Sequence, residues 1–354
     1  MSIDKFSKNQ PTLTNICSEL TNEIKLVLDN QENNLKIEEI KFIGDIQEIK
    51  NESNSMNFKI RLKNKNNLLL KKISMFKYDT NYILKMTKLI KWCKKNKISM
   101  PGIYCIKKNK PFILFNKHYW ILMEFIEGTY FKGTINQFRQ IALDFSFLTK
   151  RISKLPKQIV PKKIKKPYFE KKEIEIYTNL KNSKIHWNSI LGKLTANKLT
   201  KNWKLINFIW EDLNQTKYLS KKYDNPIHHD IHPHNLIFNN NKVFFLDHDS
   251  FILGSFQSAI GFSMLKLLKY MHDHNYKKSF ESKSSEFLNI WMKAFSEHFP
   301  NEFKKDEILK FGKAEIFRRF LSMIDKAYNK IPSSFNGPKV HLDTLLMAQK
   351  IKSN

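Results

Sequence analysis

Glycine is scarce in this sequence of 354 residues, which contains only nine. No two of them stand two positions apart, so the chain has no G-x-G element. The dinucleotide-binding fingerprint needs such glycines, because the backbone must approach the pyrophosphate closely at those positions. The sequence therefore excludes a fingerprint of that kind.

Cysteine and long apolar runs are also scarce. The three cysteines, Cys17, Cys93 and Cys105, are too few and too scattered for a disulfide framework or a structural zinc site, and they predict thiols in a reducing compartment. Residues 1–5 lack the apolar stretch of a signal peptide. The most apolar stretch, residues 119–126, is far shorter than the ~20 residues needed to cross a bilayer. We expect a cytoplasmic protein without a transmembrane segment.

Acidic residues are few relative to basic ones. The chain contains 33 Asp and Glu and 62 Lys and Arg, which gives a formal net charge of +29. Only five of the basic residues are arginine, the side chain that best binds phosphate as a planar fork. The excess of lysine favours a solvated basic surface, and no specific nucleic-acid partner is expected. For the adjacent Arg318 and Arg319 we expect a solvated helix face, with a phosphate or carboxylate subsite as the alternative.

Apolar residues are plentiful enough for a substantial core, at 41% of the chain, and the length predicts two lobes or domains. In the first part, residues 58–62 and 68–73 flank a polar turn and predict a β-hairpin. The spacing then predicts a helix over residues 82–95 and strands over 103–106 and 119–126. The turn at Glu127 is the expected end of this part.

Beyond that turn the pattern is mainly helical. Helices are predicted over residues 135–152, 170–180, 198–222, 256–273, 284–297, 303–328 and 340–352, with one β interruption at about 226–247. Residues 12–30 also have helical spacing. The sequence therefore predicts an α+β protein with an N-terminal helical extension (1–34), a small β-rich lobe (35–127) and a larger helical lobe (128–354), with a cleft between the lobes.

The densest group of chemically active side chains lies at residues 226–249. Two short apolar runs around an Asn-rich turn predict a hairpin there. In a hairpin, the residue before the first strand lies beside the residue after the second, which would bring Asn235 and Asp247 together, with Asp230 in the preceding loop. Such oxygen ligands suit magnesium, which completes its shell with waters and nucleotide phosphates.

The spacing His228-x-Asp230-x4-Asn235, followed by Asp247-x-Asp249, resembles the catalytic signature of the aminoglycoside phosphotransferase/choline kinase family. The resemblance implies a protein-kinase-like two-lobed fold, with ATP (or GTP) and Mg²⁺ as cofactors. Asp230 would orient the substrate hydroxyl and accept its proton, while Asn235 and Asp247 would bind magnesium. His228 would support the loop, and Asp249 would contact a second metal or the substrate.

Two segments of the first lobe extend the resemblance. Residues 68–73 resemble the strand with the phosphate-binding lysine, for which Lys71 is the better match and Lys72 the alternative. Only one of the two can reach the nucleotide, because neighbouring strand residues point to opposite faces. Residues 120–128 resemble the hinge strand. The backbone groups that would bind adenine belong to Glu124, Phe125 and Ile126.

Three features depart from the family pattern. Met86 stands where a helix glutamate that pairs with the lysine is expected, and the loop near residues 51–57 contains no glycine. Ala259 occupies the position of an expected structural aspartate. The first two departures weaken nucleotide binding. A catalytically degenerate kinase that acts as a binding or structural protein is therefore the main alternative.

Histidines are concentrated at residues 228–248, and with the neighbouring carboxylates they make a metal-dependent hydrolase a second alternative. Such sites usually collect ligands from several loops, whereas only His272 and His274 lie near in the later sequence. The preferred prediction is a kinase that transfers the γ-phosphoryl group of the nucleotide to a hydroxyl of a small molecule. An acidic acceptor such as a sugar phosphate would fit the net charge.

Overall fold

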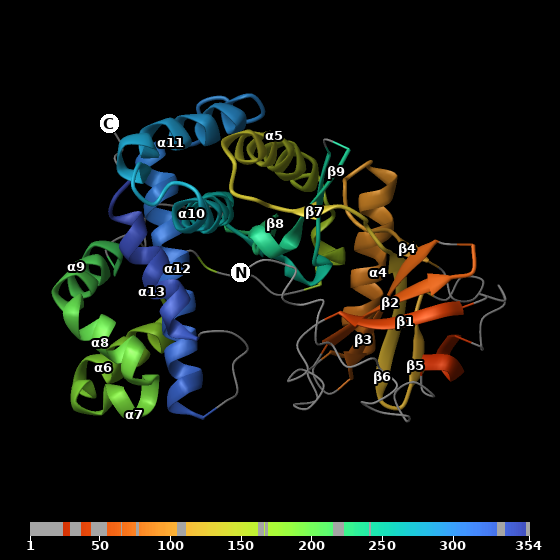
Figure 1. The fold of residues 1–354 in the computed structure, drawn as a ribbon, viewed down its shortest axis with the longest axis horizontal. Coiled ribbons are helices and arrows are strands. Elements are labelled where there is room, and N and C mark those ends of the chain that lie inside the picture. Colours follow the sequence, from red (N-terminus) through yellow and green to blue (C-terminus); the bar gives the residue numbers. More distant parts are fainter. Residues whose placement is uncertain are drawn as a thin grey trace. The chain divides into compact units, whose positions relative to one another are not determined.

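The computed structural model describes residues 24–28, 37–43, 55–64, 66–75, 78–104, 111–161, 166, 169–214, 223–240, 242–330 and 337–351. The chain forms two compact units, Met1–Glu127 and Gly128–Asn354, called here the N-terminal and C-terminal units. Figure 1 shows the largest sheet in the first and most helices in the second. None of the described helices is long and apolar enough to cross a membrane.

An antiparallel sheet forms the centre of the N-terminal unit (Figure 1). Its strands are hydrogen-bonded in the order β1 (Ile37–Ile43), β2 (Ser55–Leu62), β3 (Asn67–Ser74), β6 (His118–Glu124) and β4 (Ile103–Tyr104), and β5 (Ile113–Phe115) also pairs with β6. The predicted hairpin is confirmed as β2 and β3. β1 escaped prediction because charged residues interrupt its apolar alternation.

Each face of this sheet carries its own apolar core, because successive strand residues point to opposite sides. On one face, Leu68 and Leu70 of β3 pack with Trp120 and with the helical residues 24–28. These five residues are the described part of the helix predicted over 12–30, and the rest lies outside the described residues. On the other face, Ile73 packs against α4 (Thr80–Lys95).

Helices make up most of the C-terminal unit. They are α5 (Ile135–Ile152), α6 (Lys171–Asn182), α7 (Trp187–Leu191), α8 (Lys193–Lys201), α9 (Trp203–Asn214), α10 (Phe256–His274), α11 (Phe280–Ser296), α12 (Lys305–Tyr328) and α13 (Pro338–Ala348). The helix predicted over 198–222 is instead divided between α8 and α9 up to residue 214, and residues 215–222 lie outside the described part. The other helices expected beyond residue 128 are confirmed.

Short strands interrupt these helices. β7 (Thr129–Tyr130), β9 (Leu236–Asn239) and β10 (Lys242–Phe245) form one small sheet, and β8 (Asn225–His228) and β11 (Phe251–Gly254) form another. The β interruption predicted near residues 226–247 is confirmed. β11 was not predicted, since its residues Phe251–Leu253 are uniformly apolar and show no alternation.

Contacts between aromatic rings join α6, α9 and α12. The ring centroids of Tyr177 and Trp210 lie 4.2 Å apart, and those of Trp210 and Phe317 lie 5.6 Å apart. Trp210 and Phe317 are buried, as their helical spacing predicts. Phe208 is 63% exposed, because it lies about 200° around α9 from Trp210 and so points away from this core.

Two glycines let α10 and α12 approach each other closely. A Cβ atom on Gly261 would lie 2.2 Å from the carbonyl oxygen of Ile308, and one on Gly312 would lie 2.6 Å from the carbonyl carbon of Gly261. Both obstacles are backbone atoms, which cannot rotate out of the way as a side chain can. The contact therefore depends on the absence of side chains at these two positions.

Candidate active site

The site lies where two loops of the C-terminal unit meet. One loop joins β8 to β9 and carries Asp230 and Asn235; the other joins β10 to β11 and carries Asp247. The backbone holds them together, since His229 N donates to the Ser250 carbonyl oxygen at 3.1 Å. The pairing of β8 with β11 and of β9 with β10 therefore sets the spacing between the two loops.

The register of the β9–β10 hairpin differs by one residue from the predicted one. Asn235 lies opposite Leu246, whose N–H donates to the Asn235 carbonyl oxygen at 2.9 Å. Asp247 follows one position later in the left-handed conformation (φ 65°, ψ 72°). Aspartate tolerates this conformation better than most residues. The backbone turns there into the short helix His248–Ser250, a local change that strand alternation does not reveal.

Asn235 and Asp247 supply oxygen atoms of the kind magnesium binds. The side-chain nitrogen of Asn235 donates to the Asp230 carbonyl oxygen at 2.9 Å, which fixes the orientation of the amide and leaves Oδ1 as its acceptor end. Oδ2 of Asp247 accepts a hydrogen bond from Ser250 Oγ at 2.6 Å. An amide oxygen and a carboxylate are hard ligands, so this pair fits Mg²⁺.

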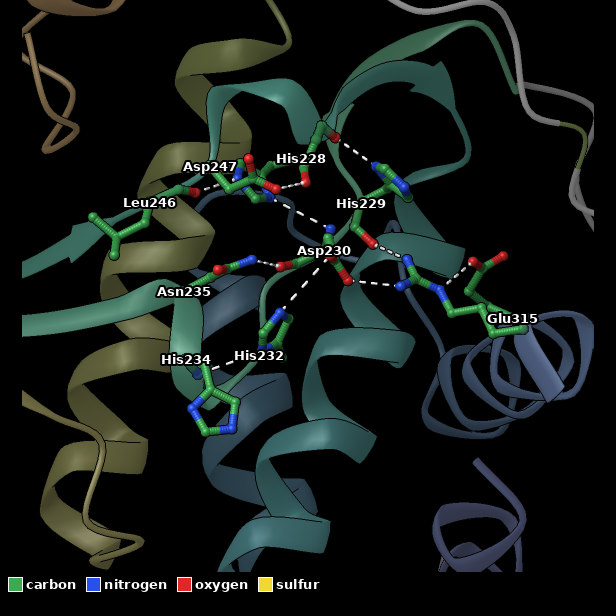
Figure 2. A network of polar contacts seen from close by, with 11 residues as sticks. His228, His229, Asp230, His232, His234, Asn235, Leu246, Asp247 and Glu315 are labelled. Carbon is green, nitrogen blue, oxygen red and sulfur yellow. Dashed lines mark hydrogen bonds and ion pairs between the residues drawn. The ribbon is translucent and has the colours of Figure 1, made fainter. Parts of the chain in front are cut away.

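His228 connects the two loops from a fully buried position (Figure 2). Its Nε2 donates to the Leu246 carbonyl oxygen at 2.9 Å, so Nδ1 is the unprotonated nitrogen and accepts from Asp230 N at 3.4 Å. Burial lowers the pKa of His228, against the opposing effect of Asp247. These contacts are those expected of a neutral side chain that supports the loop.

Asp230 lies at the centre of the polar network in Figure 2. Its Oδ1 is 2.6 Å from Nη1 of Arg319, and its Oδ2 is 3.8 Å from Nε2 of His232. Burial alone would raise the pKa of Asp230, but Arg319 reverses this, and with smaller effects of His232 and His229 holds the pKa well below its usual range. Asp230 is therefore an ionised carboxylate.

The prediction that Arg318 and Arg319 form a solvated helix face is wrong. Arg318 is 8% exposed, and Arg319 binds both the loop that carries Asp230 and the buried Glu315. Both arginines lie among the buried apolar residues of α12. The sequence contains one pointer to this arrangement, a glutamate one helical turn before an arginine within an aromatic-rich stretch.

Lys266 of α10 is a second charged residue that sequence reasoning missed. Burial lowers its pKa to about 8, with Arg319 and Lys269 adding to the effect and Asp230 opposing it. The positive charge of Lys266 also contributes, after burial, to lowering the pKa of His232, which is about 4. The site thus combines one ionised aspartate with neutral imidazole and nearby cationic groups.

The histidine-rich segment is not arranged as a zinc site. Within the residues that the structure describes, no group of three or more His, Cys, Asp or Glu side chains could hold a metal ion. His229 uses Nδ1 to contact the Ser250 carbonyl oxygen at 2.5 Å, and Asp249 is buried in the short helix after Asp247. These contacts give no support to the metal-hydrolase alternative.

In the N-terminal unit, Lys71 and Lys72 point to opposite faces of the sheet. Lys72 lies on the face of Trp120, with its ammonium 5.1 Å from the ring centroid. By strand alternation, Lys71 shares the face of Ile73 and α4, and it is partly buried. Met86 of α4 is buried against this face of the sheet, in the core cluster that contains Ile73. A thioether therefore occupies the position where a glutamate is expected.

In the hinge segment, the backbone of Glu124 is hydrogen-bonded within the protein, whereas that of the next two residues is not bonded to a described residue. Glu124 N donates to the Gly102 carbonyl oxygen at 2.9 Å, and the Glu124 side chain pairs with Lys94 at 2.7 Å. By contrast, no hydrogen bond joins the backbone of Phe125 or Ile126 to another described residue. Of the three predicted adenine contacts, Phe125 and Ile126 are therefore the ones with available backbone groups.

Comparison with known proteins identifies the fold. No model of a known protein family matches the chain, and no curated protein is similar to it in sequence. Solved structures do match: the spectinomycin phosphotransferase APH(9)-Ia in complex with ADP and spectinomycin has a TM-score of 0.64 at 14% identity, covering 93% of this chain and 97% of its own.

Two further solved structures agree. The amicoumacin kinase hAmiN, in complex with AMP-PNP and Ca²⁺, has a TM-score of 0.62 at 13% identity over 96% of both chains. The choline kinase LicA from Streptococcus pneumoniae has a TM-score of 0.55 at 12% identity, covering 94% of this chain and 99% of LicA. As the sequence predicted, the chain has the protein-kinase-like fold of the aminoglycoside phosphotransferases and choline kinases.

Proposed function

We propose that this protein is a kinase that transfers the γ-phosphoryl group of ATP or GTP to a hydroxyl group of a small molecule. The observation that carries this proposal is the ionised Asp230, held beside the oxygen ligands Asn235 and Asp247 in two loops that are hydrogen-bonded together. A carboxylate in this state can align a hydroxyl and accept its proton. The match to the fold of known kinases adds support.

Each proposed residue has a defined task. Asn235 and Asp247 would hold Mg²⁺, which neutralises charge on the phosphates when bound. In the N-terminal unit, Lys71 would bind the phosphates, while the backbone of Phe125 and Ile126, with Glu124 beside them, would bind adenine. His228 supports the loop of Asp230, and we assign the buried Asp249 to a second metal or the substrate. Catalysis would come mainly from positioning and electrostatics.

A melting-temperature titration with ATP, GTP and magnesium tests the proposal on the wild type and on Asp247→Ala in parallel. We expect the nucleotide to stabilise the wild type only when magnesium is present, because binding to the folded state alone raises stability by mass action. The effect should disappear in Asp247→Ala. An exposed carboxylate on α10, replaced in Asp273→Asn, provides the matched control.

The degenerate-kinase alternative predicts a different result. Met86 leaves Lys71 without the expected helix glutamate, so a protein that has lost nucleotide binding would show no magnesium-dependent shift. A wild type that is insensitive to both nucleotides would favour that alternative. A positive result would justify a screen of hydroxyl acceptors, with an aminoglycoside, choline, an amino-acid alcohol, a sugar and a sugar phosphate as the panel.

We place the acceptor in a pocket of about 360 Å³ between α6, α12 and α13. Arg319 lines this pocket and also binds Asp230, so the pocket adjoins the proposed catalytic carboxylate. His341 lines it as well, and its buried Nδ1 makes no hydrogen bond with another described residue. Burial, with Lys266 and Arg319, lowers the pKa of His341 to about 3, so the ring is neutral and suited to bind a hydroxyl.

The charges around this pocket favour a small polar acceptor. Arg318 presents a guanidinium group that suits an acidic group on the acceptor, whereas that of Arg319 is already bound to the loop of Asp230 and to Glu315. Ile176 and Met323 provide limited apolar surface. Glu173 lies 3.5 Å from Arg318, so carboxylate and guanidinium groups alternate along the wall. A molecule with several hydroxyls and an acidic group could bind His341 and Glu173 through its hydroxyls and Arg318 through its acidic group.

Filling the pocket should weaken acceptor binding alone. Ser322 is an exposed residue of the pocket wall, so Ser322→Trp adds bulk without disturbing the core. We expect the KM for the best acceptor of the panel to rise at least about tenfold, equivalent to about 1.4 kcal/mol, while nucleotide-dependent stabilisation is unchanged. Ser282→Trp, at an exposed serine of α11, is the control. Equal KM values in both variants would place the acceptor elsewhere.

A further inference from the structure

One guanidinium group on α12 binds both the backbone and the carboxylate of the loop that carries Asp230. Arg319 donates from Nη1 to Asp230 Oδ1 at 2.6 Å and from Nη2 to the His229 carbonyl oxygen at 2.8 Å. Its Nε donates to Glu315 Oε1 at 2.9 Å. The loop and α12 are therefore joined by two hydrogen bonds through a single planar group, while the third, to Glu315, lies within α12.

The guanidinium is itself held in place. Glu315 is 3% exposed and lies one helical turn before Arg319, on the same face of α12. The Arg319 Cζ lies 3.8 Å from the ring centroid of Phe262 on α10, at cation–π distance. Arg318 binds the second oxygen of Glu315 at 2.7 Å. Because Glu315 and Phe262 fix the guanidinium of Arg319, its N–H groups point toward Asp230 in a defined direction.

The close contact of α10 and α12 makes this arrangement possible. Gly261 and Gly312 bring the two helices together two turns before Arg319. Ala259 of α10 stands where a structural aspartate is expected, and it lines a small cavity together with His229 and Glu315. The carboxylate that α10 lacks near the loop is thus supplied by α12, in the form of Glu315 paired with Arg319.

We propose that Arg319, supported by Glu315, is a positioning residue that holds the carboxylate of Asp230 and the adjoining backbone in the orientation for phosphoryl transfer. The inference rests on the proposed function of Asp230. A misplacement of about 1 Å in such a site can cost about 100-fold in rate, because alignment of the reacting groups supplies much of the catalysis. Loss of Arg319 should therefore lower turnover and leave ligand affinity intact.

The variant Arg319→Lys keeps the positive charge and removes the planar fork, since an ammonium cannot satisfy all three acceptors in the same geometry. With ATP and the best acceptor of the panel, we expect kcat to fall about 100-fold, while the acceptor KM and the magnesium-dependent nucleotide shift stay unchanged. Arg139→Lys is the matched control, because Arg139 is an exposed residue of α5 whose Nη1 contacts Asn136 of the same helix. Its kcat should remain near that of the wild type.

Hydrogen exchange gives a second readout that does not depend on activity. Amides of residues 228–236 should exchange faster in Arg319→Lys than in the wild type or in Arg139→Lys. If Arg319→Lys does not fold, the double variant Glu315→Gln/Arg319→Gln, which removes both charges of the pair, takes its place. It should show the same loss of kcat and the same faster exchange.

Three outcomes would overturn the proposal. These are equal effects of the two lysine variants, unchanged exchange in the loop, and a fall in nucleotide affinity as large as the fall in kcat. A wild type without a magnesium-dependent nucleotide shift would refute the proposed function instead. In that case faster exchange in Arg319→Lys alone would still establish that Arg319 fixes the loop, and unchanged exchange would refute it.

Discussion

Asp230→Asn should reduce turnover about 1,000-fold while leaving the affinity for magnesium and nucleotide nearly unchanged. Asparagine keeps the shape of the side chain and can still accept the hydrogen bond from Arg319. It cannot accept a proton from the acceptor hydroxyl at neutral pH, which is the task proposed for Asp230. Initial rates with the best acceptor of the panel measure the first effect, and the nucleotide-dependent shift in melting temperature measures the second.

The controls for this variant separate catalysis from folding. Asp273→Asn, at an exposed carboxylate of α10, should keep full activity. The melting temperature of Asp230→Asn without ligands reports how far the loss of one charge beside the partly buried Arg319 weakens the fold. If nucleotide affinity fell together with turnover, Asp230 would have a structural role, and the assignment of the catalytic group would be wrong.

The parts of the site that the sequence predicted are those that lie close together in the chain. His228, Asp230 and Asn235 fall within one loop, and their spacing alone places them together. Asp247 follows after a hairpin whose strands alternate clearly. Its exact neighbour was mispredicted by one residue, because the register of a hairpin is set by its loop, here between the paired Asn239 and Lys242, and periodicity does not reveal it.

Arg319 shows the limit of this reasoning. It is 89 positions from Asp230, and only the packing of α12 against α10 brings the two together. In the sequence Arg319 is one of many basic residues, which made a solvated helix face the natural expectation. The glycines that permit the contact, Gly261 and Gly312, have no side chain whose chemistry could indicate a role. Their role depends on which face of α10 packs against which face of α12, and the tertiary structure decides this.

The fold class was easier to predict than its smaller strands. Long helices such as α5 and α10 show many turns of a 3.6-residue period, so their position is clear from the sequence. β7 and β11 contain two and four residues. Their pairing with β9 and β8 is decided by hydrogen bonds to distant segments, so their own side chains contain little information about it.

Gly261→Ala should destabilise the protein by about 3 kcal/mol or more, because the new methyl group would lie 2.2 Å from a backbone oxygen of α12. Relief requires α12 to move away from α10, and since Arg319 is part of α12, the contact with Asp230 should weaken as well. Chemical denaturation measures the loss of stability. Turnover of the folded fraction, measured well below the melting temperature, should also fall.

Gly192→Ala provides the matched control for this substitution. Gly192 has a left-handed φ of +75°, but a Cβ atom there meets nothing within 4 Å. With its ψ of 150°, only a conformational strain of about 1–3 kcal/mol should appear, with turnover unchanged. A Gly261→Ala protein as stable and as active as Gly192→Ala would show that α10 and α12 can separate without disturbing the site. Loss of both stability and turnover in Gly261→Ala alone would tie the catalytic loop to this helix contact.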